Sequence, residues 1–421
     1  MDAERNWAQN LTFGTTRVVT PTTTEQLAEL VADAAPGTVR PLGTRHSFSP
    51  IADTTGVLVS SAGFADAAAI HVADDRASVR TPAGIRYGEL ARALEARGLA
   101  LANLASLPHI SVAGAVATGT HGSGVANRSL AGAVRSIEFV DGTGALVSLR
   151  RDDPSFAGAV VSLGALGIVT HLELDVEPSF EVAQTVYRGL PFRELLEAFD
   201  DVAGLGYSVS LFTTWSDADT VDQLWLKRRL DRDAAAPSEV LGARPSPVAM
   251  HPIAGVDPVH CTTQLGIPGP WLDRLPHFKL EFTPSNGAEL QTEYLVPRAT
   301  ALDALRAVHE LAPRIRPLLQ VTEIRMIAAD ELWLSGASRT DAVGIHFTWQ
   351  PDEHAVDALL PAIEERLLPL GARPHWGKRF HADAAALEAL YPRLADFRSL
   401  ARRHDPRGVF VNDFLRAKLA L

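Results

Sequence analysis

The sequence predicts an α+β protein built from more than one domain. Apolar residues recur with helical spacing in some segments and alternate with polar residues in others, and both kinds of segment are mixed along the chain. At 421 residues the chain is too long for one ordinary core. The usual domain size of about 150 residues suggests two or three units, and we expect two.

The composition is typical of a globular protein without membrane spans. Hydrophobic residues make up 46% and charged residues 21%, and no apolar run approaches the ~20 residues that cross a bilayer. A formal net charge of −11 argues against a nucleic-acid partner, because such proteins concentrate Lys and Arg. The run Met1 to Trp7 is acidic where an export signal is basic and then apolar. We therefore expect a cytoplasmic protein.

Cysteine and histidine usage argues against structural cross-links and metals. Cys261 is the single cysteine, which excludes an internal disulfide and cysteine-based zinc sites. His251, His260 and Cys261 lack the spacing of metal ligands. We expect no metal.

Helices and strands alternate through the first 177 residues. Leu27, Leu30, Val31 and Ala34 share one side of a predicted helix over residues 24–35, and a strand then enters the loop that begins at Pro41. The pair Asp141-Gly142 predicts a tight hairpin that ends in a strand over residues 144–148. Further strands are expected at 56–60, 77–80, 136–140 and 168–176, with a helix over 87–97.

The segment Ala105 to Gly124 is rich in small residues. Its glycines at 114, 119, 122 and 124 would let the backbone approach a large planar ligand closely. A flexible linker is the alternative, but Ile110, Val112 and Val116 make the segment too apolar for that.

A second unit is expected to begin near Pro178, with an antiparallel sheet covered by helices. Residues 231–258 lack periodicity and are either an ordered excursion or a mobile loop. From 387 the chain turns helical, and the apolar run 408–414 suggests a return to a core. Strands are predicted at 208–214, 278–283, 290–296, 319–327 and 343–349, and helices at 192–203, 299–311 and 353–368.

The loop Pro41 to Ser47 is the first candidate binding element. Gly43 is free to adopt positive φ, and Thr44, Arg45 and Ser47 offer donors, so the backbone can wrap a pyrophosphate with His46 beside it. The loop lacks the Lys-Ser/Thr of a P-loop and the three-glycine spacing of dinucleotide-binding turns. Read alone, it also fits an ordinary surface turn.

Two predicted strands each carry a polar pair two residues apart. Glu323 and Arg325 share one strand face, as do His346 and Thr348, with apolar residues on the opposite faces. If the strands are neighbours, the four side chains form a floor suited to a polyhydroxylated ligand. A solvated sheet face is the alternative.

The run His375 to Lys378 is the third candidate. Gly377 permits a tight bend, so that Lys378 can point a positive charge into a cavity. A surface turn with a partly buried Trp376 is the alternative.

Taken together and in order, these segments resemble the FAD-dependent oxidases of the vanillyl-alcohol oxidase type, and within them the alditol and aldonolactone oxidases. The resemblance implies an FAD-binding domain over residues 1–177, a substrate (cap) domain with an antiparallel sheet over 178–378, and a segment 379–421 that returns to the first domain. The matching segments are 43–47, 106–124, 164–169, 323–325, 346–348 and 375–378.

The resemblance also implies that FAD is attached covalently through His46, by a ring nitrogen that the sequence does not identify. The other FAD contacts that it implies are Pro41, Leu42, Gly43, Thr44, Arg45, Ser47, Ser106, Ser111, Gly114, Thr118, Gly119, Thr120, His121 and Val169.

The implied reaction is oxidation of the terminal primary hydroxyl of an alditol, such as xylitol or sorbitol, to the aldose, with O2 reduced to hydrogen peroxide. Arg325 and Lys378 would stabilise developing negative charge, and Glu323 would orient hydroxyls and accept a proton. Ser106, His346 and Thr348 would complete the substrate contacts. An aldonolactone oxidase or dehydrogenase stays open, as does a noncatalytic flavin or polyol carrier. We expect a monomer with small-molecule partners only.

Overall fold

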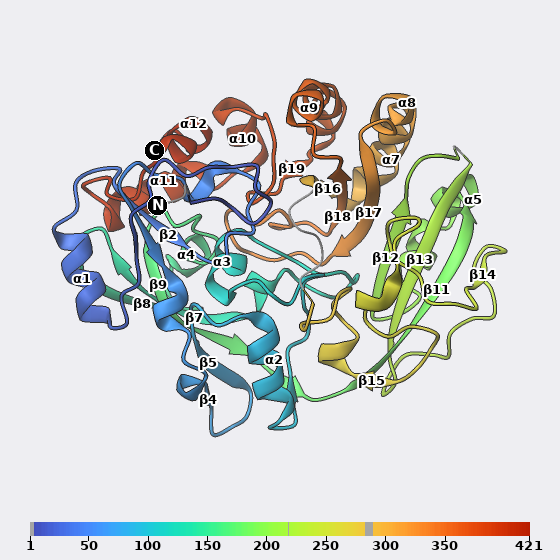
Figure 1. Cartoon of the computed structure of the whole chain (residues 1–421), viewed down its shortest axis with the longest axis horizontal. Helices are drawn as coiled ribbons and strands as arrows, with labels where there is room; N and C mark the ends of the chain where they lie inside the picture. The colour runs from blue at the N-terminus through green and yellow to red at the C-terminus, as the bar shows by residue number, and fades with distance from the viewer. Residues whose placement is uncertain (1–3, 218, 283–288) are drawn as a thin grey trace.

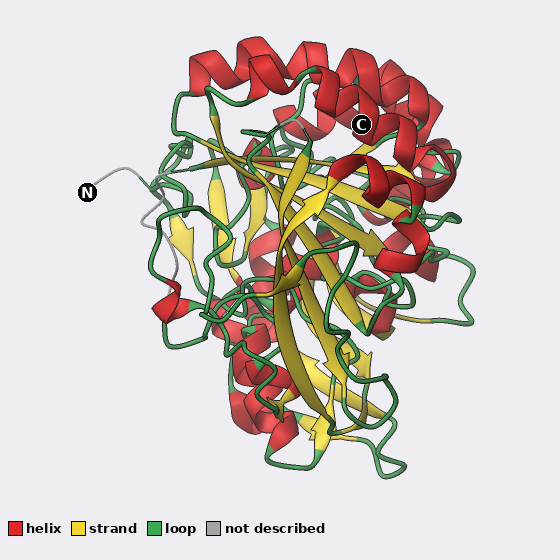
Figure 2. Cartoon of the chain, turned by 90° about the vertical axis from the view of Figure 1, so that its right-hand side faces the viewer, coloured by secondary structure: helices red, strands yellow, loops and turns green. Residues whose placement is uncertain are grey.

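The computed structural model describes residues 4–217, 219–282 and 289–421 and confirms the α+β class (Figure 1). Among these residues the strands form four sheets, of nine, five, three and two strands. Helices lie against the sheets on the outside of the molecule, and long twisted strands cross its middle (Figure 2). No helix in the described ranges is long and apolar enough to span a bilayer.

The first part of the chain builds the smaller sheets. Leu27 and Val31 of helix α1 (Thr24–Ala32) are fully buried against β2 (Val39–Leu42) and β3 (Val57–Ser60), as the helical spacing predicted. The hairpin of β7 and β8 turns at Gly142 and Gly144, and Gly144 has φ +84. The three-stranded sheet orders β1 (Val18–Val19), β3 (Val57–Ser60) and β2 (Val39–Leu42); the five-stranded sheet orders β4 (His71–Val72), β5 (Ser78–Pro82), β9 (Gly167–Asp175), β7 (Val134–Asp141) and β8 (Leu146–Arg150); β6 (Leu99–Ala100) pairs with β10 (Glu177–Pro178).

Four short helices accompany these sheets. The segment Ala105 to Gly124, predicted to be too apolar for a flexible linker, contains helix α3 (Val112–Ala117), whose Val112 and Val116 are buried in the core. The helices are α1 (Thr24–Ala32), α2 (Tyr87–Glu95), α3 (Val112–Ala117) and α4 (Phe156–Ala159).

A large antiparallel sheet fills the second part of the chain. Its apolar face packs against helices α5 to α9 and buries Ile324, Ile345 and Phe347 completely. The sheet orders β14 (Arg244–Pro245), β11 (Glu181–Pro191), β13 (Thr220–Arg229), β12 (Ser208–Thr213), β17 (Leu319–Ile327), β18 (Ala342–Trp349), β16 (Leu290–Pro297) and β19 (Arg373–Pro374), with β15 (Gly269–Pro270) paired to β11. The helices are α5 (Phe192–Glu197), α6 (Phe199–Ala203), α7 (Ala301–Glu310), α8 (Ala312–Ile315) and α9 (Glu353–Leu367).

The C-terminal segment packs against the start of the chain. Val409 and Phe410 are fully buried with Leu27 and Val39, and the Val39 N–H donates to the Val409 carbonyl at 3.2 Å. The division at residues 177 and 378 stays a prediction. The segment carries α10 (Ala384–Leu390), α11 (Leu394–His404) and α12 (Asp413–Leu419).

Three local predictions were wrong. Residues 278–282 form no strand; in this described stretch Phe278 only makes an isolated bridge to Cys261, and Thr283 lies outside the described residues. The helix expected over 192–203 breaks at Ala198 into α5 and α6. In the loop after β2 the residue with positive φ is Arg45, at +65°, and not Gly43.

Besides several two-residue strands, two long strands were missed. β11 and β13 pair along most of their lengths toward one edge of the large sheet. Both are largely buried on both faces, so their sequences lack the clean alternation of a half-buried strand.

Arg40 joins three parts of the chain from inside the core. Its guanidinium is 1% exposed and donates to the backbone carbonyls of Ile51, Leu163, Gly164 and Phe410 at 2.5 to 3.0 Å. Burial lowers the pKa of Arg40 to about 9. The hydrogen bonds hold β2, the loop before β9 and the C-terminal segment together.

Arg40→Leu should therefore destabilise the protein strongly. Buried carbonyls that lose their donor cost about 1–3 kcal/mol each, and we expect a loss of at least about 3 kcal/mol. The change is measured as a fall in the guanidinium chloride midpoint. Arg150→Leu, at an exposed position of β8, is the matched control. Equal midpoints for the two variants would contradict the role of Arg40.

Candidate active site

A cavity of about 560 Å³ lies between the loop after β2, the segment around α3 and the polar face of the large sheet. Of the site residues predicted from sequence, Gly119 does not line it within the described structure. The lining includes Pro41, Leu42, Gly43, Thr44, Arg45, His46, Ser47, Ser106, Ser111, Gly114, Thr118, Thr120, His121, Val169, Glu323, Arg325, His346, Thr348 and Lys378.

His46 lines this cavity as a neutral imidazole. Its ring stacks on Trp7, with centroids 5.2 Å apart and planes 20° from parallel. Burial lowers the pKa of His46 to about 4. Both ring nitrogens are buried, and neither has a hydrogen-bond partner among the described residues. Such an unpartnered buried group indicates a ligand.

The backbone around His46 is closely packed. A Cβ on Gly43 would lie 2.6 Å from Ser111 Oγ, and one on Gly114 would lie 2.8 Å from the same atom. The Ser111 N–H donates to Thr44 Oγ1 at 3.2 Å, while Ser111 Oγ is buried without a partner in the described part of the chain. A side chain at position 43 or 114 would therefore displace the Ser111 hydroxyl.

Three neighbouring strands form the polar floor of the cavity. β17 and β18 are adjacent, which meets the condition for the floor, and Glu323 is paired with His346 across them. On the far side of β18, strand β16 contributes Glu293 opposite His346 and Gln291 opposite Thr348. The contribution of β16 was missed, although residues 289, 291 and 293 show the same alternation that identified the other two strands.

Arg325 lies between two buried carboxylates. Its Nη2 is 2.6 Å from Glu293 Oε1 and its Nε is 3.6 Å from Glu323 Oε2. Burial raises the pKa of each carboxyl, but Arg325 and the neighbouring histidines together outweigh burial and hold both well below their usual range. Gly344 of β18 is paired with Arg325 of β17. A Cβ on Gly344 would lie 3.2 Å from Glu293 Oε1. The missing side chain lets the guanidinium reach Glu293.

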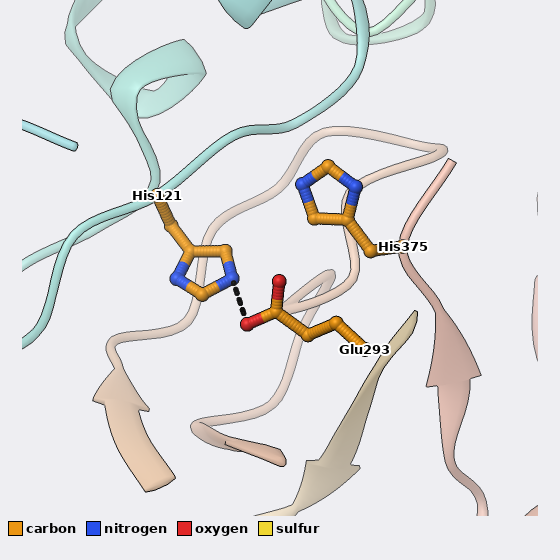
Figure 3. A group of neighbouring side chains, drawn as sticks. All are labelled: His121, Glu293 and His375. Carbon is orange, nitrogen blue, oxygen red and sulfur yellow. Dashed lines mark ion pairs between the residues drawn. The ribbon is translucent and has the colours of Figure 1, made fainter. Parts of the chain in front are cut away.

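Two histidines meet Glu293 at the cavity wall (Figure 3). His121 Nε2 lies 3.2 Å from Glu293 Oε1, and atoms of His121, Glu293 and His375 lie within 4.8 Å of one another, a spacing that could hold a metal ion. Arg325 already donates to the same Glu293 oxygen. We therefore interpret the cluster as a charge network.

His375 and Lys378 lie on one tight turn. The Lys378 N–H donates to the His375 carbonyl at 3.0 Å, and His375 Nδ1 accepts from the Gly377 N–H at 3.1 Å. Burial lowers the pKa of His375 to about 3 and that of Lys378 to about 8. Lys378 Nζ donates to Gln291 Oε1, which brings the cation to the edge of the floor.

Comparison with known protein families gives two matches along the chain. A model described as FAD binding domain matches residues 15–150, and a model described as D-arabinono-1,4-lactone oxidase matches residues 287–418.

Individual relatives cover nearly the whole chain. An alditol oxidase of Streptomyces sp. (strain IKD472 / FERM P-14339) is 51% identical over 98% of both chains. An L-gulono-1,4-lactone dehydrogenase of Mycobacterium tuberculosis (strain ATCC 25618 / H37Rv) is 30% identical over 98% of both. The crystal structure of cholesterol oxidase from B. sterolicum has a TM-score of 0.76 at 18% identity, covers 98% of this chain and 96% of its own, and supports the fold alone.

His375→Asn should flatten the pH dependence of stability. The folded protein resists protonation of His375 down to about pH 3, whereas the unfolded chain binds that proton below about pH 6.5. As far as His375 is concerned, the free energy of unfolding is therefore at its full value above about pH 6.5. It falls by about 1.4 kcal/mol per pH unit as the pH drops from there toward 3. Asparagine retains an acceptor for the Gly377 N–H without titrating.

The measurement is the guanidinium chloride midpoint of wild type and variant at several pH values within that window. His354→Asn, at an exposed position, controls for the substitution. If the midpoints of wild type and His375→Asn change with pH in parallel, His375 is not held neutral in the folded protein.

Proposed function

The chain belongs to the family of FAD-dependent oxidases that includes the alditol and aldonolactone oxidases, and from this premise we propose that it oxidises the terminal primary hydroxyl of alditols such as xylitol and sorbitol to the aldose, producing hydrogen peroxide from O2. The observation that carries the proposal is the polar floor of β16, β17 and β18, which shares one cavity with His46.

The residues around His46 fit FAD. The unpartnered ring nitrogens of His46 and the close backbone approach at Gly43 and Gly114 are what a tightly held cofactor needs, judged over the described residues. Bound FAD would accept a hydride from the alcohol carbon and pass the electrons to O2. We infer that His46 carries FAD covalently. Its pKa of about 4 supports this, because the imidazole keeps a free lone pair at neutral pH.

Binding of the substrate falls to the floor. His346 Nε2 and Thr348 Oγ1 lie 3.2 Å apart and offer a donor and an acceptor side by side, which suits neighbouring hydroxyls of a polyol. Gln291 extends this row across β18. Ser106 Oγ lies 3.4 Å from Arg325 Nη1 and would contact the hydroxyl that reacts. The remaining cavity residues named above from the family resemblance would line FAD.

The charges around the floor suit removal of the hydroxyl proton. Arg325 and Lys378 would stabilise the developing alkoxide, and Glu323 would orient the hydroxyl and accept its proton. Because its low pKa makes Glu323 a weak base, the two cations must supply most of the driving force. Cytoplasmic location, absence of membrane or nucleic-acid partners and a monomeric state remain predictions.

An aldonolactone oxidase or dehydrogenase is the second candidate. The 30% identical relative and the lactone oxidase model over residues 287–418 favour keeping it. Xylitol and sorbitol compared with gulono- and galactono-lactones, each with O2 or an artificial acceptor, separate the two. A flavin that none of these compounds reduces would favour a carrier.

The decisive experiment is acid denaturation of the purified protein followed by removal of small molecules and an absorbance spectrum, together with a peroxide assay with xylitol under air. We expect flavin to stay with the wild-type chain and leave a His46→Ala chain, while peroxide forms with wild type. Release of flavin from the denatured wild-type chain would refute the covalent link. Flavin that stays bound, with no peroxide formed from any alditol, would refute the oxidase activity.

Lys378→Arg should move the alkaline limit of activity. With a pKa of about 8, Lys378 loses its charge as pH rises through that value, so kcat/KM should fall there. Arginine stays protonated, so the variant should retain its activity to higher pH, at a maximum about tenfold lower because the head group differs in shape. The check is a kcat/KM profile with xylitol; identical alkaline limbs would exclude Lys378 as the essential cation.

A further inference from the structure

A buried lysine, Lys227, is connected to Glu323 through His277 and has no part in the chemistry above. Lys227 of β13 is 1% exposed, and His277 lies between it and Glu323. The three side chains form a line: Lys227 Nζ is 3.1 Å from His277 Nδ1, and His277 Nε2 is 2.7 Å from Glu323 Oε1. A lysine is rarely buried without a specific reason.

The hydrogen bonds of Lys227 define where the protons lie. In the described structure its ammonium has three acceptors for three N–H groups: the carbonyls of Leu275 and Pro276, and His277 Nδ1. Burial lowers the pKa of Lys227 to about 7, so Lys227 is an ammonium below that pH. In that form Lys227 is the donor, and His277 Nδ1 carries the lone pair. The ring proton is therefore on Nε2 and is donated to Glu323.

The same arrangement keeps His277 neutral. A second ring proton would have to lie on Nδ1, against the ammonium. Burial first, and then the charge of Lys227, lower the pKa of His277 to about 4. The groups that face this pair are Glu323 and Arg325 from β17 and Cys261 from the adjoining loop.

His277 is also held rigidly. Trp225 and Phe212 contact its ring edge-on, with centroids at 5.2 and 5.5 Å. Its backbone N–H donates to the Ser106 carbonyl at 3.1 Å. One residue thus ties Ser106 and Glu323, two proposed substrate contacts, to the same point.

We propose that Lys227 and His277 are positioning residues for the reaction: Lys227 selects the Nε2–H tautomer of His277, and His277 holds Glu323 Oε1, leaving Oε2 for the substrate hydroxyl. The inference deepens the proposed function and rests on it. A purely structural role, in which the pair only fills the space beneath the sheet, makes different predictions.

The first test is a double-mutant cycle with His277→Leu and Glu323→Gln. Loss of a hydrogen bond to a charged group should lower kcat/KM for xylitol about 10- to 100-fold in His277→Leu. In the Glu323→Gln background the same change should cost less than about twofold, because the group it acts through is gone. His277→Gln, whose amide N–H can still reach Glu323, should recover most of the loss.

The second test uses Lys227→Met with Lys279→Met as the matched control. Lys279 is an exposed lysine whose Nζ donates to the Val259 carbonyl, so its loss should leave kcat/KM within about twofold. Lys227→Met should lower it by more than the control does, in proportion to the share of His277 that then adopts the Nδ1–H tautomer, which cannot donate to Glu323.

A third readout does not depend on turnover. In protein labelled with ¹⁵N-histidine, the His277 resonances, assigned by their loss in His277→Gln, should show a neutral ring protonated at Nε2. Lys227→Met should shift them toward a mixture of tautomers. A charged ring or an Nδ1–H tautomer in wild type would overturn the inference. So would an equal fall in kcat/KM when His277→Leu is made in wild type and in Glu323→Gln. A wild type that oxidises no alditol would instead remove the proposed function, and the NMR result would still decide the tautomer.

Discussion

The ion pairs of Arg325 with two buried carboxylates constrain the rest of the site. Glu293 and Glu323 both lie under the cavity, and burying either charge alone would be costly. One guanidinium can meet both only if β16, β18 and β17 are neighbours in that order and the residue between them is Gly344. The strand order and a glycine are therefore as necessary to the floor as the charged residues themselves.

One face of the large sheet packs against helices and stabilises the fold, and the other face lines the cavity. Ile324, Ile345 and Phe347 are buried beneath helices on one face, and this packing supports the polar residues that alternate with them on the other. Because strand positions alternate strictly, the apolar face that stabilises the sheet also aims Glu323 and His346 at the cavity. Stability and site geometry thus come from the same strands.

Neutral histidines surround this charged centre. Burial lowers the pKa of His46, His277 and His375 to between about 3 and 4, so each keeps a lone pair at neutral pH. The three differ in what they contact. His46 lies among the cavity residues that fit FAD, His277 holds Glu323, and His375 shapes the turn that carries Lys378. The cavity therefore concentrates positive charge in Arg325 and Lys378, beside the substrate floor.

The sequence by itself determined the local features. Alternation placed Glu323 with Arg325 and His346 with Thr348, helical spacing predicted α1 and α9, and the ordered motifs indicated an FAD-dependent oxidase, because such patterns depend on residues close together in the chain. Only the tertiary structure decided that Glu293 pairs with Arg325 and that Lys227 reaches Glu323 through His277. These contacts join segments 32 to 50 residues apart or cross several strands, so they depend on strand order and packing, which no local pattern specifies.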